Sequence, residues 1–199
     1  MGTKCGNTVR LYASQTEAVW NAICRDGIAF CKEDYIIKKY DAAAPVFLTA
    51  YRWFVEKAQA IVPRPEGAAF PYWVFADPMM METGKSSYVL ALDVPVEEAL
   101  FFDMFDWNQI LQFHLLSKDP MEERRFLEEL NARGIRANDI MLTGFYPDLR
   151  QRVLDSWELL FRHHNAARVG NTEGIGKLQA ALWQIRRDWV VSVNGKPMQ

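Results

Sequence analysis

The residue types most often used in catalysis are few in this sequence and match no established catalytic pattern. Its histidines and cysteines are His114, His163, His164, Cys5, Cys24 and Cys31. The sequence contains no GxSxG nucleophile elbow and no papain-type cysteine signature. It also lacks the GxxxxGK[ST] phosphate loop and the GxGxxG dinucleotide fingerprint. A hydrolase with a serine or cysteine nucleophile is therefore unsupported, as is a P-loop or Rossmann nucleotide site.

The cysteines and histidines also give no metal-binding pattern. An odd number of cysteines without a CxxC pair fits neither a disulfide framework nor a four-ligand zinc site, and it favours a reducing compartment. Adjacent side chains on a helix point about 100° apart, so His163 and His164 are poorly placed to share one metal ion. We expect no metal site. We expect this histidine pair at the end of a helix, where a cation complements the macrodipole.

Two further segments have a chemical interpretation and a plainer structural one. Gly170, Gly174 and Gly176 look like a phosphate-binding loop, but their spacing favours a flexible connector. Met79–Met81 lies between two predicted strands, and methionine packs adaptably. Filling of the core is the favoured role for these methionines, and a loop that faces a partner is the alternative.

Aromatic, amide and hydroxyl side chains recur at the ends of the predicted elements. The candidate ligand-binding residues are Tyr12, Gln15, Thr16, Tyr51, Trp73 and Gln179. Large aromatic rings with a few amides and hydroxyls are the typical lining of a nucleotide-sized pocket. They are equally typical of a core in which indole N–H groups need partners. Composition alone favours the core, and the sequence leaves both interpretations open.

The elements that must position these residues are short strands and helices. Strands are predicted over residues 9–13, 28–30, 70–75, 87–94, 100–103, 182–185 and 189–193. Helices are predicted after the caps Thr16, Asp106 and Asp119, over residues 46–61, and from Pro147 onward. Strands near both ends of the chain with helices between them predict an α+β fold. In that fold a small, mainly antiparallel sheet packs against several helices.

Length and composition fit one domain. The chain has 199 residues, of which 50% are hydrophobic, and a formal net charge of −2. A chain of this length can bury one core, so we expect a single domain over residues 1–199, with about 1–8 and 195–199 flexible. Near-neutral charge argues against a nucleic-acid partner, which requires a basic surface. Without a signal peptide or a membrane-spanning apolar window, we expect a cytoplasmic protein that does not enter a membrane.

A set of aromatic and polar segments is spread over most of the chain. They are Leu11–Thr16 with Trp20, Phe47–Trp53, Pro65–Gly67, Pro71–Trp73, Leu92–Pro95, Asp103 with Trp107 and Leu111, Ser156–Glu158 and Gln179–Trp183. In this order the segments resemble the bacterial domain-of-unknown-function family 3841. Residues 77–81 depart from that family's pattern, in which we expect a basic and acidic segment. The resemblance names no reaction.

The two ends of the chain carry motifs with a more distant likeness. They are Leu11-Tyr12 with Thr16 and Gly27 near the start, and Gln179-Ala180-Ala181 near the end. These motifs resemble those of ADP-ribosyltransferase-like domains. The resemblance implies an ADP-ribosyltransferase-like fold that binds NAD, with the first strand near the nicotinamide-ribose region. It also implies a catalytic glutamate at the position of Ala181, where a carboxylate would stabilise the developing oxocarbenium charge.

Because alanine cannot supply a carboxylate, the resemblance leaves two outcomes. Either transferase activity is lost and a nucleotide pocket remains, or another residue substitutes, the candidates being Glu158, Glu173 and Gln179. The usual first-strand histidine or arginine is also replaced, by Ala13 or Ser14. We therefore predict a nucleotide-binding, ADP-ribosyltransferase-like domain with an incomplete catalytic set. The alternative is a non-enzymatic protein-interaction or regulatory module associated with a phage or a toxin.

Overall fold

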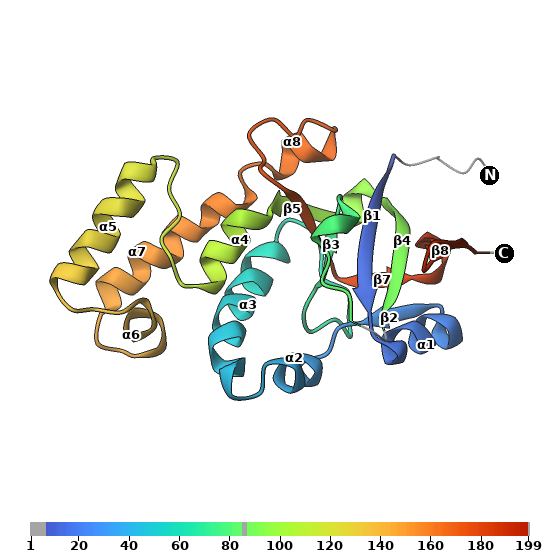
Figure 1. Cartoon of the computed structure of the whole chain (residues 1–199), viewed down its shortest axis with the longest axis horizontal. Coiled ribbons are helices and arrows are strands. Elements are labelled where there is room, and N and C mark those ends of the chain that lie inside the picture. Colours follow the sequence, from blue (N-terminus) through green and yellow to red (C-terminus); the bar gives the residue numbers. More distant parts are fainter. Residues whose placement is uncertain (1–6, 85–86, 199) are drawn as a thin grey trace.

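An antiparallel sheet, seven-stranded in the described part of the chain, forms one end of the molecule, and helices extend from it (Figure 1). The computed structural model describes residues 7–84 and 87–198. The strand order is β5-β6-β3-β1-β4-β8-β9. The bounds are β1 Thr8–Gln15, β3 Tyr72–Phe75, β4 Tyr88–Pro95, β5 Ala99–Asp103, β6 Leu178–Leu182, β8 Val190–Val193 and β9 Lys196–Pro197. A separate small sheet pairs β2 (Ile28–Phe30) with β7 (Gln184–Arg186).

Helices are placed by clear local signals. Their bounds are α1 Glu17–Asp26, α2 Glu33–Tyr40, α3 Ala44–Ala58, α4 Met104–Leu111, α5 Pro120–Ala132, α6 Ala137–Leu142, α7 Pro147–Trp157 and α8 His164–Arg168. Thr16 caps α1 by accepting a hydrogen bond from the backbone N–H of Val19, and Gly27 ends the helix with φ of +76°. Asp119 caps α5 by accepting from the N–H of Met121 at 2.9 Å.

The two faces of the sheet differ in character. One face carries Leu11, Ala13, Leu90 and Leu92, all fully buried, and Trp20 of α1 stacks on Tyr88 at its edge. The other, which we call the aromatic face, carries Tyr12, Trp73, Phe75, Gln179 and Phe102. Helices α3 and α4 cover part of the aromatic face, since Phe54 and Trp107 both contact Trp73 and Phe102. The core therefore continues from the sheet into these two helices.

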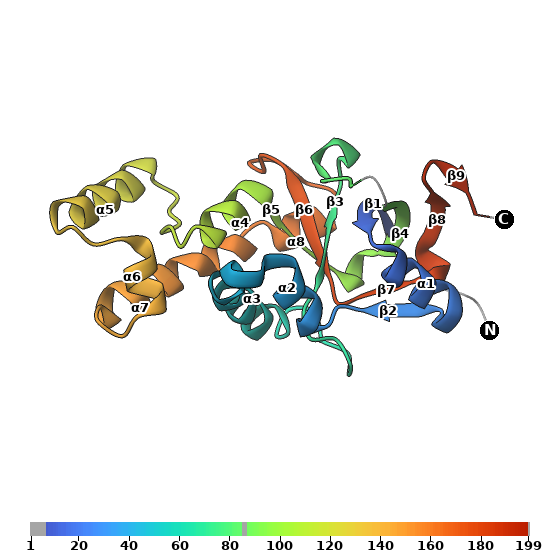
Figure 2. The ribbon, with the colours of Figure 1, turned by 60° about the horizontal axis from the view of Figure 1, so that its bottom comes forward.

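Helices α5, α6 and α7 form an arm at the end of the molecule opposite the sheet, as both views show (Figures 1 and 2). Phe126, Leu130, Ile140 and Val153 are buried within this arm. The arm is joined to the rest of the chain where the indole N–H of Trp157 donates to the carbonyl oxygen of His114 at 2.8 Å. Helix α6 also contacts α3.

The predicted α+β fold with an antiparallel sheet is confirmed. Several predicted elements also match: β2 coincides with residues 28–30, and α5 and α7 begin at Pro120 and Pro147. The expected cap Asp106 is wrong, because the cap is Asp103, whose carboxylate accepts from the N–H of Phe105 at 2.9 Å. Helices α2, α6 and α8 were not predicted. The strand predicted over residues 182–185 is wrong, because these residues are divided between the end of β6 and the start of β7.

The ends of the chain are only partly described. Residues 1–6 and 199, where we expected flexibility, lie outside the described residues, whereas Thr8 and Lys196 belong to strands. No helix in the described ranges is long and apolar enough to cross a membrane.

Candidate functional site

Strand pairing places residues of four strands in one row across the aromatic face. Tyr12 of β1 pairs with Phe75 of β3, Phe75 with Gln179 of β6, and Gln179 with Phe102 of β5. Residues that pair directly in a sheet have side chains on the same face. Tyr12 and Phe75 are half-buried, whereas Gln179 and Phe102 are buried. The row thus passes from a partly open surface to the covered core, and Gln179 is the first fully covered residue in it.

A second row lies beside the first and carries Trp73. Trp73 pairs with Ala181, and Ala181 pairs with Leu100. The half-buried Trp73 indole donates a hydrogen bond to the hydroxyl of Tyr51 at 3.0 Å, and its ring centre is 4.6 Å from that of Trp107. Tyr51 in turn lies 3.2 Å from the hydroxyl of Tyr40. Burial raises the pKa of Tyr51 above its ordinary value, so its hydroxyl stays protonated and remains a hydrogen-bonding group.

Gln179 is the polar residue of the first row, and its environment is unusual. Its side chain is 4% exposed, and its amide oxygen accepts no hydrogen bond from any residue in the described ranges. Leaving a buried acceptor unpaired costs about 1–3 kcal/mol, so such groups call for an explanation. An N–H donor brought by a ligand is one such explanation.

Three other buried side chains in the described residues have a polar atom without a hydrogen bond, and each has a different setting. Tyr72 alternates with Trp73 and so lies on the opposite face of the sheet. Trp53 packs between Trp157 and Phe161. Asp106 forms an ion pair with Arg162 at 2.8 Å. None of them belongs to the aromatic face.

The structure brings together only part of the predicted ligand-binding set. Tyr12, Trp73 and Gln179 share the aromatic face, and Tyr51 packs on Trp73. Gln15 alternates onto the opposite face beside Tyr88, and the side chain of Thr16 caps α1. These two residues therefore do not join the others. Because β1 extends to Gln15, beyond the strand predicted over residues 9–13, the spacing of three residues places Tyr12 and Gln15 on opposite faces.

The carboxylates predicted as substitutes for a catalytic glutamate are not in either row. Glu158 is exposed and forms an ion pair with Lys57 of α3 at 2.8 Å. Glu173 is exposed in the turn before β6, where its N–H donates to the side chain of Asn171. At the position that the resemblance assigns to a glutamate, Ala181 is buried between Trp73 and Leu100.

The glycine-rich segment before β6 is closed by a carboxylate. Asp103 accepts hydrogen bonds from the N–H of Gly176 at 2.6 Å and from the N–H of Lys177 at 3.4 Å. A Cβ at Gly176 would lie 2.7 Å from the ring of Phe105, so only glycine fits there without a shift. Because the carboxylate already occupies these two N–H groups, they are not free to bind a phosphate. The segment is therefore a connector, and hydrogen bonds to the carboxylate of Asp103 hold it in place.

Two residues of the site were not predicted from the sequence, and two predictions for residues outside the site are wrong. Phe75 and Phe102 complete the first row, and only the strand register reveals this. The expectation of core filling is wrong for Met79, which is 82% exposed. The expected cationic role at a helix end is wrong for His164, which begins α8 and is buried. Its Nδ1 accepts a hydrogen bond from the N–H of Phe101, and burial lowers its pKa to about 4.

The described residues hold no group of three or more histidine, cysteine, aspartate or glutamate side chains that could bind a metal ion. The aromatic face carries the half-buried rings of Tyr12, Trp73 and Phe75 beside the buried amide oxygen of Gln179. A planar group can stack on the accessible parts of these rings.

Comparison with known proteins identifies a family. A family model described as a domain of unknown function, DUF3841, matches residues 10–191. No curated protein matches the chain, and no solved structure matches it. The resemblance to ADP-ribosyltransferases thus gains no support from these comparisons. Because the family match covers most of the sequence, the chain belongs to the DUF3841 family.

Proposed function

We propose that this protein binds a nucleotide-class ligand, such as NAD, on the aromatic face at Gln179, and that it does not transfer ADP-ribose. The observation that carries the proposal is the buried amide oxygen of Gln179, which has no hydrogen-bond donor among the described residues. A nicotinamide carboxamide or an adenine amino group would supply the missing N–H donor. Burying this oxygen would then cost less in the complex than in the free protein.

The aromatic side chains next to Gln179 support a planar ligand. Tyr12, Phe75 and Trp73 are half-buried, so parts of their rings remain accessible. Planar rings stack on aromatic side chains with a gain of about 1–3 kcal/mol per base. These three rings lie on the same face of the sheet as Gln179.

The absence of transfer follows from the carboxylates. Ala181 cannot stabilise an oxocarbenium charge, and the carboxylate of Asp103 is engaged by backbone N–H groups of Phe105 and Gly176. Glu158 and Glu173 lie outside both rows of the aromatic face. A bound nucleotide would therefore be held without a catalytic carboxylate beside its ribose.

Calorimetry with NAD, AMP and nicotinamide mononucleotide tests this proposal. We expect Gln179→Leu to weaken binding about tenfold, because it removes the acceptor. The matched control is Gln15→Leu, the same change on the opposite face, which should leave affinity unchanged. Gln179→Leu should also keep or raise the free energy of unfolding of the free protein, since it removes an unpaired polar group. No binding of any of the three ligands, or equal loss in both variants, would overturn the proposal, and transfer from labelled NAD would refute its second half.

A protein-interaction role is a second candidate, favoured by apolar side chains that project from the surface. Phe145, in the turn between α6 and α7, is 80% exposed. A photo-crosslinking phenylalanine analogue at position 145 in cells should give one discrete adduct, and the same analogue at Arg125 should not. Identical adduct patterns at the two positions, or no adduct, would argue against this role.

A further inference from the structure

A second candidate site lies apart from the aromatic face, where α4 leads into the arm. A cavity of about 230 Å³ is present there. Its lining residues are Gln109, Gln112, His114, Leu115, Glu123, Phe126 and Leu127. The cavity is smaller than the roughly 300–1,000 Å³ of sites for drug-sized ligands, so it suits a small molecule.

The hydrogen bond made by His114 fixes which of its ring nitrogens is an acceptor. Nδ1 of His114 bonds to the amide oxygen of Gln109. An amide oxygen only accepts hydrogen bonds, so Nδ1 is the donor and carries the proton. Burial lowers the pKa of His114 below its ordinary value, and the ring is neutral at pH 7. Nε2 therefore presents a lone pair.

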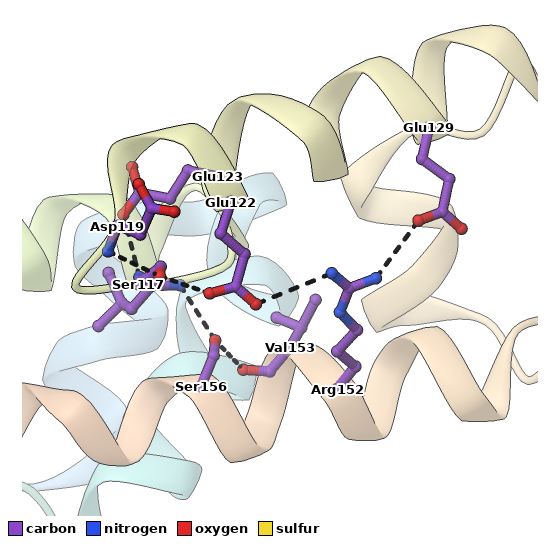
Figure 3. A network of polar contacts seen from close by, with 9 residues as sticks. Ser117, Asp119, Glu122, Glu123, Glu129, Arg152, Val153 and Ser156 are labelled. Atoms are coloured by element: carbon purple, nitrogen blue, oxygen red, sulfur yellow. Dashed lines mark hydrogen bonds and ion pairs between the residues drawn. The ribbon is translucent and has the colours of Figure 1, made fainter.

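Two further side chains add acceptors to the cavity. The amide nitrogen of Gln112 donates to the carbonyl oxygen of Asn108 at 3.1 Å, which leaves its amide oxygen to accept. One carboxylate oxygen of Glu123 accepts from the N–H of Ser117 at 3.0 Å (Figure 3). The ion pairs of the described residues do not include Glu123, so its negative charge is not neutralised by a neighbouring cation.

These groups define the chemistry of a ligand. A neutral imidazole nitrogen, an amide oxygen and a carboxylate all accept hydrogen bonds, and together they carry one negative charge. Leu115, Phe126 and Leu127 supply an apolar wall. We propose that this cavity binds the ammonium group of a small alkylamine, with its alkyl chain on the apolar wall. An ammonium group has three N–H donors, which matches the three acceptors in number.

A metal ion fits less well than an ammonium group. Among the described residues no cluster of three or more histidine, cysteine, aspartate or glutamate side chains is present, and this cavity has one histidine and one carboxylate. Zinc sites in proteins usually take three or four such ligands. An amine can come from a free metabolite or from a lysine side chain of another protein, and the experiment must separate these sources.

The test is an NMR titration of the protein with butylamine at pH 7, observed at the ring signals of His114. Butanol is the neutral control, and Nα-acetyl-lysine amide represents a lysine side chain. We expect saturable shifts with butylamine and none with butanol. Weaker binding of the lysine compound would identify a free amine as the ligand, and tighter binding a protein lysine, both within the proposal.

Matched variants on α5 complete the test. Glu123→Gln should weaken butylamine binding about tenfold, because it removes the charge and keeps an oxygen for the N–H of Ser117. Glu128→Gln, on the exposed surface of the same helix, should have no effect. Equal shifts with butanol, equal affinities of the two variants, or shifts produced by Zn²⁺ and not by butylamine would each overturn the proposal. Amine binding in this cavity is independent of nucleotide binding at Gln179, so either proposal can fail while the other holds.

Discussion

The arm and the rest of the molecule, which we call the body, are each stabilised internally by a different kind of contact. In the body, aromatic rings from distant parts of the sequence pack on one another, as Tyr51, Trp73 and Phe102 do. Around the core of the arm, charged side chains join neighbouring helices: Arg152 of α7 lies 4.0 Å from Glu122 and 3.3 Å from Glu129 of α5 (Figure 3). Exposed ion pairs contribute about 0–1 kcal/mol each, whereas a buried ring contributes several.

This difference indicates which region of the molecule tolerates amino-acid substitutions. The aromatic face lies beside fully buried rings such as Phe54 and Phe102, so substitutions of these rings should be costly. The polar contacts of the arm are weaker and sensitive to salt. Substitutions should therefore separate the two regions by the size and by the salt dependence of their effects.

The largest expected effect is in the body. Phe54 is fully buried and contacts Trp73, Phe102 and Trp107. Phe54→Ala should lower the free energy of unfolding by about 3–5 kcal/mol, because it removes a ring and leaves a cavity. Chemical denaturation measures this loss. The matched control Phe145→Ala, in the arm, should change it by less than about 0.5 kcal/mol, since Phe145 is 80% exposed. Similar losses in the two variants would contradict the larger packing contribution of the body.

The next effect is a pH dependence of the free energy of unfolding, which arises from His164 in the body. His164 covers edge strand β5, where its Nδ1 accepts from the N–H of Phe101 at 3.2 Å. Burial lowers its pKa from 6.5 to about 4. The unfolded chain therefore binds a proton more readily than the folded protein between pH 6.5 and 4. The contribution of His164 to the free energy of unfolding should be fully present above about pH 6.5. It should fall by up to about 3 kcal/mol as the pH drops to 4.

Unfolding measured across this pH range tests the role of His164. His164→Gln keeps an acceptor for Phe101 and removes the titrating group, so its pH profile should be flatter. Part of the slope should remain, because burial also lowers the pKa of His114. A His164→Gln profile as steep as that of the unchanged protein would assign the pH dependence to other groups.

A smaller effect is expected at the glycine-rich segment. Gly176→Ala would place a Cβ 2.7 Å from the ring of Phe105 and 3.2 Å from the carboxylate of Asp103. Since Phe105 is 53% exposed and can shift, we expect a loss of about 1 kcal/mol. Gly144→Ala, whose Cβ would meet nothing within 4 Å, is the control in the turn before α7. Thermal unfolding that ranks Gly144→Ala as the more harmful change would contradict this account of the segment.

The smallest effect is expected in the arm. A double-mutant cycle with Arg152→Ala and Glu129→Gln should give a coupling free energy of about 0.2–1 kcal/mol. It should decrease in high salt, because the pair is solvent-exposed. Arg152→Ala alone should cost more than the coupling, because the guanidinium also lies over the ring of Phe126 at 4.7 Å. A coupling that is larger and independent of salt would remove the distinction between arm and body.

Local signals predicted much of the fold. Capping residues and prolines located α1, α5 and α7, because these signals act within a few residues of a helix end. The alternation of apolar residues located β1 and β4. Helix α2 was missed because its sequence, Glu33–Tyr40, has no residue that caps it through its side chain. The strand predicted over residues 100–103 ends at Asp103, as β5 does, but Asp106 was chosen as the cap because it directly precedes Trp107, the first apolar residue of the predicted helix.

The candidate site was predictable only in part. The residue types of Tyr12, Trp73 and Gln179 were identified from the sequence, but their shared face depends on the pairing of β1 with β3 and of β3 with β6. These pairings join segments far apart in the chain, so no local pattern specifies them. Gln15 was included wrongly, because the predicted strand ended at residue 13, whereas β1 extends to Gln15 and alternation along it places Gln15 opposite Tyr12.

The most direct test of ligand binding at the aromatic face is the side-chain amide signal of Gln179 in an NMR titration with nicotinamide mononucleotide. The signal is assigned by its loss in Gln179→Leu. We predict that it shifts in a saturable way together with the backbone signal of Ala181, while the side-chain amide of Gln15 stays in place. A Gln179 signal that does not move, or a Gln15 signal that moves equally, would contradict the account.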